Sequence, residues 1–293
     1  MEGRHAATRS DWLATEEPLE IRLLTEEAGL IRLEGRGSLQ RPAAGRPVAI
    51  TMRTPGDDLA LAAGFLHGEG IVREPGDIRR IGHCEDRALA AERRGNTVDV
   101  ELRAGLRPDL KALERHFYTT SACGVCGKAS LDALRLRGHA AVPPGPVVAP
   151  AVLYGLPGRL RAAQTLFGAT GGLHAAALFD AEGEMLALRE DVGRHNAVDK
   201  LVGWALMEGR LPLHGHLVMV SGRSSFEILQ KCLEAEVPIV CAVSAPTSLA
   251  VAVAREFGVT LIGFLRGERF NVYAGIERVE GVTGSSAVVP ADR

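Results

Sequence analysis

The C-terminal half of the chain alternates short, continuous apolar runs with segments of helical periodicity, and this pattern restricts the possible folds most. Apolar runs at His216–Ser221, Ile239–Val243 and Thr260–Leu265 predict strands. Helices are predicted between them, from Ser224 to Glu236 and from Thr247 to Phe257. Continuous apolar strands joined through helices are typical of right-handed crossovers and of a sheet covered on both faces. The sequence therefore predicts an α/β fold with a three-layer core and a mostly parallel sheet.

Four further elements are predicted ahead of these. Val152–Phe167 has a helical pattern, and the apolar runs Leu173–Phe179 and Glu184–Arg189 flank Asp-Ala-Glu-Gly, which is typical of a hairpin turn. Another helix is predicted from Arg194 to Met207. From residue 152 onward the expected order is thus α-β-β-α-β-α-β-α-β.

A proline-rich stretch, Val142–Pro150, divides the chain, with four prolines in nine residues. Such a stretch stays extended and is typical of a linker. Ahead of it, apolar runs at Val48–Arg53 and Thr97–Arg103 predict strands, and a helix is predicted from Asp57 through Phe65. A smaller, β-rich α+β region is therefore expected before the linker.

These features give an expected division of the whole chain. The first residues are charged and rich in glycine, and they are expected to be irregular or poorly ordered. The expected segments are residues 1–46 (irregular), 47–141 (the α+β region, ending in a CxxC loop and a helix), 142–150 (linker), 151–280 (the α/β domain) and 281–293 (tail).

Charge and composition exclude several classes of protein. The 34 Lys and Arg against 36 Asp and Glu give a net charge of -2, so no nucleic-acid partner is expected. Met1–Asp11 is short and polar, unlike a secretory signal. One uncharged stretch, Val237–Ala254, is long enough to span a membrane, but Pro246 and several hydroxyl residues divide it. It is expected to form strand, turn and helix, so no membrane partner is expected.

Cys123-Gly-Val-Cys126 is the strongest local signal for chemistry. The five cysteines of the chain are an odd and sparse set, which argues against a disulfide framework and for a reduced, cytoplasmic protein. The pair lies in a loop of small and hydroxylated residues ahead of a predicted helix, where the helix dipole and Lys128 would stabilise a thiolate. Three interpretations compete: a redox dithiol, half of a zinc site, and a sulfur carrier.

The zinc interpretation needs more ligands than the sequence supplies. His67-Gly-Glu69, upstream of the cysteine pair, is similar to part of the zinc deaminase signature. However, His67 lies at a helix end among glycines and is expected to be solvated. No second CxxC is present, so a four-cysteine site is also missing, and no zinc is expected. A thioredoxin-like site would need a strand directly before the CxxC, although a different dithiol oxidoreductase stays open.

Polar segments follow four of the predicted strands. They are Glu190–Lys200, Ser221–Ser225, Ser244–Ser248 and Phe264–Arg269. The carboxyl ends of parallel strands meet at one edge of a sheet, and ligands bind at that edge in folds of this kind. Helix N-termini rich in Gly, Ser and Arg suit phosphate groups. Together, these segments predict a site for a phosphorylated ligand.

Seven segments in order also carry a family pattern. They are Thr51–Asp57, Gly64–Leu66 together with Glu69–Ile71, Thr120–Gly127, Thr170–Ala176, Glu190–Asn196, Ser221–Glu227 and Phe264–Asn271. In these segments, which span about residues 47 to 275, the sequence resembles the formate dehydrogenase accessory sulfurtransferases of the FdhD family. His67 falls outside the family's pattern, and the Thr25–Gly45 region departs from it.

The resemblance implies a function. Members of the family carry sulfur from a cysteine desulfurase to the molybdenum cofactor in its bis(guanine dinucleotide) form, which is then inserted into formate dehydrogenase. By resemblance, Cys123 carries the persulfide and Cys126 assists. The residues implied to contact the cofactor are Phe264, Leu265, Arg266, Gly267, Glu268 and Arg269. The implied fold is cytidine-deaminase-like, and the implied assembly is a homodimer.

A sulfur carrier with sulfurtransferase activity is therefore the expected function, and a cytosolic thiol-disulfide oxidoreductase that uses the CxxC pair is the alternative. A passive chaperone that only binds the cofactor would need the ligand site predicted at the carboxyl ends of the strands. It would have no use for two neighbouring nucleophiles, so the CxxC pair argues against it. The predicted element order after the linker is that of a deaminase core. The helix starts that hold metal ligands in deaminases here hold Arg194-His195 and Ser224-Ser225, with no cysteine.

Overall fold

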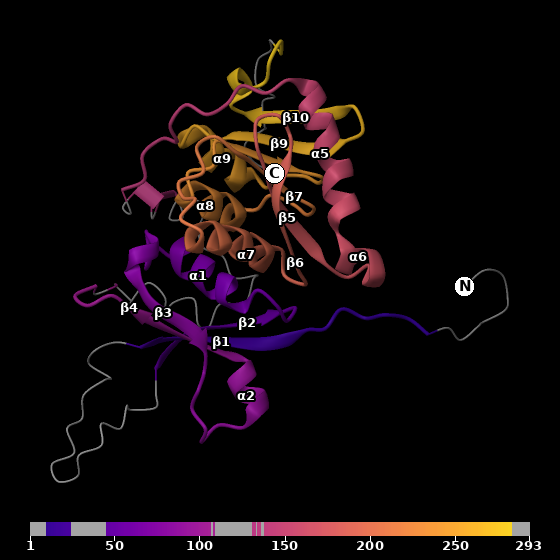
Figure 1. Ribbon diagram of the computed structural model, residues 1–293. Helices are drawn as coiled ribbons and strands as arrows, with labels where there is room; N and C mark the ends of the chain where they lie inside the picture. Colours follow the sequence, from indigo (N-terminus) through magenta and orange to yellow (C-terminus); the bar gives the residue numbers. More distant parts are fainter. Residues whose placement is uncertain are drawn as a thin grey trace, which may run out of the picture.

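The computed structural model describes residues 10–24, 45–106, 108, 131–132, 134–135 and 138–282. These residues form two sheets, one at each end of the molecule, with helices α1 (Asp58–Gly68) and α7 (Arg194–Met207) between them (Figure 1). Within this described part, no helix has the length and apolar character needed to cross a membrane.

The N-terminal sheet has four strands in the order β2-β1-β4-β3. They are β1 (Glu17–Leu24), β2 (Arg46–Arg53), β3 (Ile78–His83) and β4 (Thr97–Leu102). The fully buried Leu19, Ile21 and Leu23 alternate along β1 with charged residues, so one face of the sheet packs against α1. The short helix α2 (Ala91–Gly95) lies on the other side of the sheet (Figure 1).

The expectation that residues 1–46 are irregular is wrong for Glu17–Leu24. This segment is β1, an inner strand that runs antiparallel to β2 and parallel to β4. Its apolar residues have the period of two that a half-buried strand requires. The sequence analysis did not recognise this alternation, because the segment around it is highly charged and was expected to be irregular. Strand β3 was also absent from the prediction, because Ile78 and Ile81 are its only large apolar residues.

The C-terminal unit follows the predicted order of elements, except that the helix predicted at Val152–Phe167 is divided into two helices and one strand is added. The elements are α5 (Pro150–Ala163), α6 (Thr165–Thr170), β5 (His174–Phe179), β6 (Met185–Asp191), α7, β7 (Leu217–Val220), α8 (Phe226–Glu234), β8 (Ile239–Ala242), α9 (Ser248–Glu256), β9 (Thr260–Arg266) and β10 (Arg269–Ala274). The uncharged stretch 237–254 contains β8, a turn and the start of α9, so the prediction of strand, turn and helix is confirmed.

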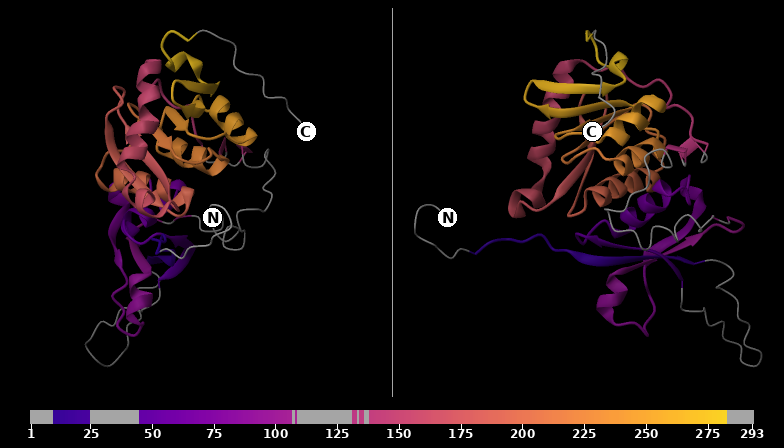
Figure 2. Two further views of the ribbon diagram at one scale, coloured as in Figure 1. Left: turned by 90° about the vertical axis from the view of Figure 1, so that its right-hand side faces the viewer. Right: turned by 180° about the vertical axis from the view of Figure 1, so that it is seen from behind.

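Three layers make up this unit. Leu153, Leu156 and Leu160 of α5 pack with the side chains on one face of the sheet. Helices α7, α8 and α9 pack on the opposite face (Figure 2), in a core cluster that includes Val218 and Val240 of the sheet. The expected three-layer α/β core is therefore present, whereas the cytidine-deaminase likeness stays a prediction.

The expectation of a mostly parallel sheet needs correction, because the six-stranded sheet is mixed. Its order is β10-β9-β8-β7-β5-β6. Among the described strands, β7 pairs parallel with β8 and β8 with β9, whereas the other three pairings are antiparallel. Two hairpins account for the antiparallel pairings. One turns at Gly183 and the other at Gly267, and both glycines have a positive φ. The second hairpin adds β10, which the prediction lacked because Arg269 and Asn271 interrupt its apolar residues.

The predicted linker contains no helix or strand ahead of Pro150, but it lies against the C-terminal unit. The backbone N–H of Val142 donates to the carbonyl of Phe257, and that of Val148 donates to the carbonyl of Arg278. The chain between the two sheets is therefore anchored rather than free. The domain boundaries themselves stay predictions.

Helices α1 and α7 meet through two glycines. A Cβ atom on Gly64 would fall on the carbonyl oxygen of Asp199, and one on Gly203 would fall on the carbonyl oxygen of Ala60. Only glycine allows backbones to approach this closely. The two sheets are therefore joined through direct contact of helix backbones.

Candidate functional site

The structure brings the predicted polar segments together at one edge of the six-stranded sheet. The backbone N–H of Thr247 donates to the carbonyl of Ser224 at 2.9 Å, which joins the segments that follow β7 and β8. The backbone N–H of Phe264 donates to the carbonyl of Ser244 at 3.1 Å, which joins the end of β9 to the same edge. We call this edge, made of residues 190–200, 221–225, 244–248 and 264–269, the strand-end site.

The fourth segment reaches the site because β5 runs antiparallel to β7 and β6 antiparallel to β5. The start of β5 and the end of β6 therefore lie beside the carboxyl end of β7. Gly222 lies close to both: a Cβ there would be 3.3 Å from Nδ1 of His174 and 3.9 Å from Cβ of Arg194. The convergence of all four segments, which the sequence predicted, is observed.

The predicted cofactor-contacting residues form the end of β9 and the turn into β10. Phe264 has φ of 53°, a left-handed conformation that is unusual for an aromatic residue, and its side chain is 41% exposed. Leu265 is fully buried in the core, so only its backbone is available to a ligand. The side chains of Arg266, Glu268 and Arg269 are exposed. Arg266 donates from Nε to the carbonyl of Val243 at 2.9 Å, which orients its guanidinium over the end of β8.

Gly267 has a conformational reason to be glycine. Its φ is 53°, and no atom lies within 4 Å of the position that a Cβ would take. A left-handed turn residue between two antiparallel strands is commonly glycine for this reason alone. A close approach of ligand to this backbone therefore stays a prediction.

Two histidines that sequence reasoning did not assign lie at the site. His195 Nε2 is 3.3 Å from the Ser225 hydroxyl and 3.7 Å from a Glu227 carboxylate oxygen. Burial and the nearby Arg194 lower the pKa of His195 to about 4. The same two causes, burial first and then Arg194, lower the pKa of His174. Both imidazoles are therefore neutral at pH 7.

Ser224-Ser-Phe-Glu227 has the sequence pattern of a capping box, but the start of α8 does not form one. Ser225 is the N-cap residue, and its hydroxyl makes no capping hydrogen bond. The Ser224 hydroxyl, in a residue with no exposed surface, has no hydrogen-bond partner. The Ser225 hydroxyl lies 3.3 Å from His195 Nε2 of α7 and hydrogen-bonds the Glu227 carboxylate, which also accepts from its own backbone N–H.

Cys123 and Cys126 lie outside the described residues, so their surroundings stay a prediction. The other three cysteines, Cys84, Cys232 and Cys241, are described, and all are buried free thiols. Complete burial raises the pKa of Cys232 and of Cys241 to about 12.

His67 is buried, which contradicts the expectation of a solvated side chain. Only 4% of it is exposed, and its ring nitrogens lie 2.9 Å from the Val72 carbonyl and 3.2 Å from the Glu234 carbonyl. Burial lowers its pKa. Among described residues, no group of three or more His, Cys, Asp or Glu side chains is placed to hold a metal ion. The absence of zinc at the CxxC remains a prediction.

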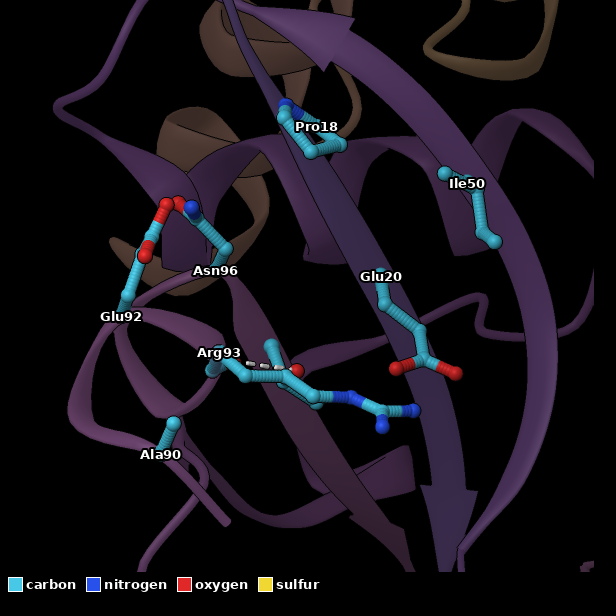
Figure 3. A pocket seen from close by; sticks show the side chains of 8 residues that line it. Pro18, Glu20, Ile50, Ala90, Glu92, Arg93 and Asn96 are labelled. Atoms are coloured by element: carbon cyan, nitrogen blue, oxygen red, sulfur yellow. Dashed lines mark hydrogen bonds between the residues drawn. The ribbon is translucent and has the colours of Figure 1, made fainter.

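A cavity of about 380 Å³ lies on the face of the N-terminal sheet that carries α2, and Figure 3 shows the side chains that line it. Residues of β1, β2 and α2 line it, among them Glu20, Ile50 and Arg93. None of the predicted site residues lines this cavity. Its mixed walls, with acidic, basic and apolar side chains, define no ligand chemistry.

Comparison with known proteins identifies the class of protein. The model of the FdhD/NarQ family matches residues 39–280, so the chain belongs to this family. Its relatives include the sulfur carrier protein FdhD of Streptomyces coelicolor, which is 53% identical over 276 residues, covering 93% of this chain and 90% of the relative. The sulfur carrier protein FdhD of Mycobacterium tuberculosis is 47% identical over 93% of each chain, and that of Sulfurisphaera tokodaii is 42% identical over 93% of each.

A solved structure has the same fold. The crystal structure of a putative formate dehydrogenase accessory protein from Desulfotalea psychrophila matches with a TM-score of 0.65 and 24% sequence identity. The match covers 92% of this chain and 91% of that one. The fold with two sheets is therefore also found in another protein of known structure.

Proposed function

We propose that this chain is a sulfurtransferase that carries sulfur as a persulfide on Cys123, with Cys126 assisting. The proposed donor is a cysteine desulfurase. The proposed acceptor is the molybdenum bis(guanine dinucleotide) cofactor, which is the substrate here and is bound before insertion into formate dehydrogenase. Membership of the family and the relatives named as sulfur carriers support this proposal.

The observation that carries the proposal is the burial of the other cysteines. A thiolate is the attacking species in sulfur transfer. A thiol with a pKa of about 12, as for Cys232 and Cys241, is almost entirely protonated at pH 7. Cys84 is 95% buried, with Arg22 Nη2 at 2.9 Å from its sulfur. Of the five cysteines in the chain, the CxxC pair is thus left as the candidate nucleophile.

In the proposed transfer, the Cys123 thiolate attacks the outer sulfur of a persulfide on the desulfurase. The sulfur–sulfur bond of the donor breaks, and the donor cysteine leaves as a thiolate. Cys123 then holds the sulfane sulfur as an ionised persulfide. The persulfide bond would then break as a molybdenum–sulfur bond forms on the cofactor, which supplies the two electrons that convert the sulfane sulfur to sulfide, and Cys123 would leave as a thiolate.

The strand-end site is the proposed place where the cofactor's guanine dinucleotide binds. The exposed Phe264 ring offers a surface for stacking a base, and the guanidinium groups of Arg266 and Arg269 suit phosphates. The family resemblance also points to these residues. Formate dehydrogenase is the proposed client, and a second copy of the chain is the proposed dimer partner.

Mass spectrometry after incubation with a cysteine desulfurase and cysteine tests the proposal. We expect a gain of one sulfur on the peptide that contains Cys123, and its loss in Cys123→Ala. Cys232→Ser is the matched control and should take up sulfur like the parent, because its thiol is buried. A persulfide on another cysteine would overturn the proposal. Formation of a Cys123–Cys126 disulfide without any persulfide would favour the thiol-disulfide oxidoreductase instead.

A further inference from the structure

The segment ahead of β1 is an extended arm, residues 10–16, with few contacts to the rest of the chain. It forms no helix or strand, and from β1 it runs away from the N-terminal sheet (Figures 1 and 2). Trp12 and Leu13 expose 78% and 83% of their surface. Among the described residues, the one hydrogen bond of the arm joins the Trp12 N–H to the Asp11 carboxylate. The arm therefore presents unpaired backbone groups and two large apolar side chains.

Strand β2 is an edge of the N-terminal sheet, and part of that edge is open. The Glu20 N–H donates to the Asn96 carbonyl on the β4 side of β1, so the backbone groups of Glu20 and its partner Ile50 point away from each other. The N–H and C=O of Ile50 face outward, where no described residue pairs with them. At Met52, the next outward-facing position, the carbonyl accepts from Asn196 Nδ2 at 2.7 Å. The open stretch is therefore centred on Ile50.

An apolar wall of the cavity on the N-terminal sheet lies beside this open stretch. The side chain of Ile50 is 62% exposed, and it lines the cavity together with Pro18 and Ala90 (Figure 3). An exposed apolar edge is a template for strand addition, in which backbone pairing provides affinity and pockets take alternate side chains of the added strand. The edge and the cavity together therefore suit an extended segment that carries a large apolar side chain.

The arm points away from this edge of its own sheet. Strands β1 and β2 are antiparallel with Glu17 opposite Arg53, so the arm leaves the sheet beyond the last residue of β2. It then passes the C-terminal unit, where a Cβ on Gly172 would lie 3.4 Å from Cβ of Ala14. To pair with Ile50 of the same chain, the arm would have to leave this contact and turn back around the end of β2. Another copy of the chain can offer its edge without such a reversal.

We propose that the arm of one copy of this chain adds to the β2 edge of a second copy, with Trp12 packed against Ile50 and the apolar wall of the cavity. Each chain carries both parts, so two copies can exchange arms about a two-fold axis and close both open edges. Trp12 lies five positions before Glu17, which gives the arm a reach of about 17 Å. The inference rests on the proposed function only for the dimer partner, whose interface it specifies.

The first test measures the dimer by sedimentation velocity of the full chain. We expect the parent to dimerise, and Trp12→Ala to raise the dissociation constant about thirtyfold or more, as for a central tryptophan of an interface. Met207→Ala is the matched control: it removes another exposed apolar side chain, at the end of α7, and should leave the dissociation constant unchanged. A parent that is monomeric at every concentration, or a dimer that Trp12→Ala leaves unchanged, overturns the inference.

The second test is Ile50→Pro, which addresses the backbone pairing. Proline removes the outward-facing N–H at this position but breaks no hydrogen bond between β1 and β2, and proline is tolerated on edge strands. We expect a monomer with the circular dichroism spectrum of the parent. A dimer of unchanged affinity would contradict strand addition at this edge.

A photo-cross-link locates the contact without disturbing the edge. Benzoylphenylalanine replaces Trp12, and isotope-labelled and unlabelled chains are mixed before irradiation. We expect cross-linked peptides that join position 12 of one chain to β2 of the other, which mass spectrometry recognises as pairs of mixed isotope content. Cross-links to another segment, or only within one chain, would show that the arm binds elsewhere.

This inference and the proposed function can fail separately. If Cys123 accepts no sulfur but the dimer depends on Trp12, the interface stands and the sulfur carrier does not. If Cys123 becomes persulfidated and neither Trp12→Ala nor Ile50→Pro alters the dimer, the sulfur carrier stands and this interface is wrong.

Discussion

Lys200 and Asp191 form an ion pair with 2.8 Å between Nζ and Oδ2, and neither side chain exposes more than 1% of its surface. Both also bind the segment that leaves β2. Lys200 Nζ donates to the Thr54 carbonyl at 2.8 Å, and Asp191 accepts from the Thr54 backbone N–H at 3.1 Å. Asp191 further accepts from Gly193 N–H and from the Asn196 side chain. This pair therefore ties the N-terminal sheet to the start of α7 and orients that helix end.

Replacing Lys200 by methionine should strongly destabilise the chain. The substitution leaves Asp191 charged and buried without its cation, and breaking a buried pair in this way costs about 3–5 kcal/mol. The free energy of unfolding is measured by urea denaturation. Arg79→Gln is the control, since Arg79 is 67% exposed in its pair with Glu101 and should contribute less than about 1 kcal/mol. Equal effects of the two variants would contradict the role given to the buried pair.

The glycine contact between α1 and α7 gives a second prediction. Gly64→Ala should cost about 3 kcal/mol or more in the free energy of unfolding, because the new methyl group would overlap the Asp199 carbonyl. Gly155→Ala is the matched control: it lies in the exposed face of α5 with nothing within 4 Å of the new Cβ. It should stabilise the chain by about 0.5–1 kcal/mol. A well-tolerated alanine at position 64 would show that the helices can separate.

Stability should fall in mild acid, in part through His195. Its pKa is lowered to about 4 in the folded chain, whereas the unfolded chain takes up a proton near the ordinary value of about 6.5. The stabilisation is therefore complete above pH 6.5 and is lost as the pH falls toward 4. With the side chain 30% exposed, we expect the loss to be about 2–3 kcal/mol. Thermal unfolding from pH 7.5 to 4 should show a shallower decline for His195→Gln, and parallel curves would count against this assignment.

Guanine nucleotide binding should depend on the arginines at the end of β9. A charge-assisted hydrogen bond to a phosphate contributes about 1.5–3 kcal/mol, so Arg266→Ala and Arg269→Ala should each weaken the binding of guanosine diphosphate roughly ten- to a hundredfold. Arg87→Ala, an exposed arginine in the N-terminal unit, is the control. Calorimetry gives the dissociation constants. Binding that is unchanged in both arginine variants would place the nucleotide elsewhere.

Whether a ligand approaches the backbone at Gly267 can be tested only with a substitution that the local backbone conformation tolerates. Because φ is 53° there, Gly267→Val would strain the turn whatever a ligand does. Gly267→Asn is the better variant, since asparagine tolerates this conformation. Weaker nucleotide binding with an unchanged free energy of unfolding would indicate that the ligand approaches the backbone closely.

The predictable part of the fold is the part with continuous apolar strands. The runs that became β7, β8 and β9 are bounded by glycine, proline and hydroxyl residues, and their order with the helices follows from chain connectivity. Strand β1 was missed because the surrounding segment is highly charged, and β10 because Arg269 and Asn271 interrupt its apolar residues. The direction of β5 relative to β7 could not be predicted, because it depends on pairing between residues more than 40 positions apart, such as Ala176 and Val220.

The site was predictable to a similar extent. Convergence of the segments that follow the strands is a general property of such sheets, and it is observed. The contact between His195 and Ser225 joins two helices and leaves no trace in local sequence. The buried state of His67 was missed for the same reason, since its partner at Glu234 is 167 positions away.

The backbone contact between Gly64 and Gly203 also bears on how far the chain is modular. Helix α1 comes from the N-terminal part of the chain, yet α7 of the C-terminal part fills the face that α1 turns away from its own sheet. A cut in the 142–150 segment would divide the sequence neatly, but it would expose an inner surface on each fragment. Neither half could be exchanged for that of a distant relative unless both helices were transplanted together. The unit that can be inherited or engineered is therefore the pair of sheets, not either one.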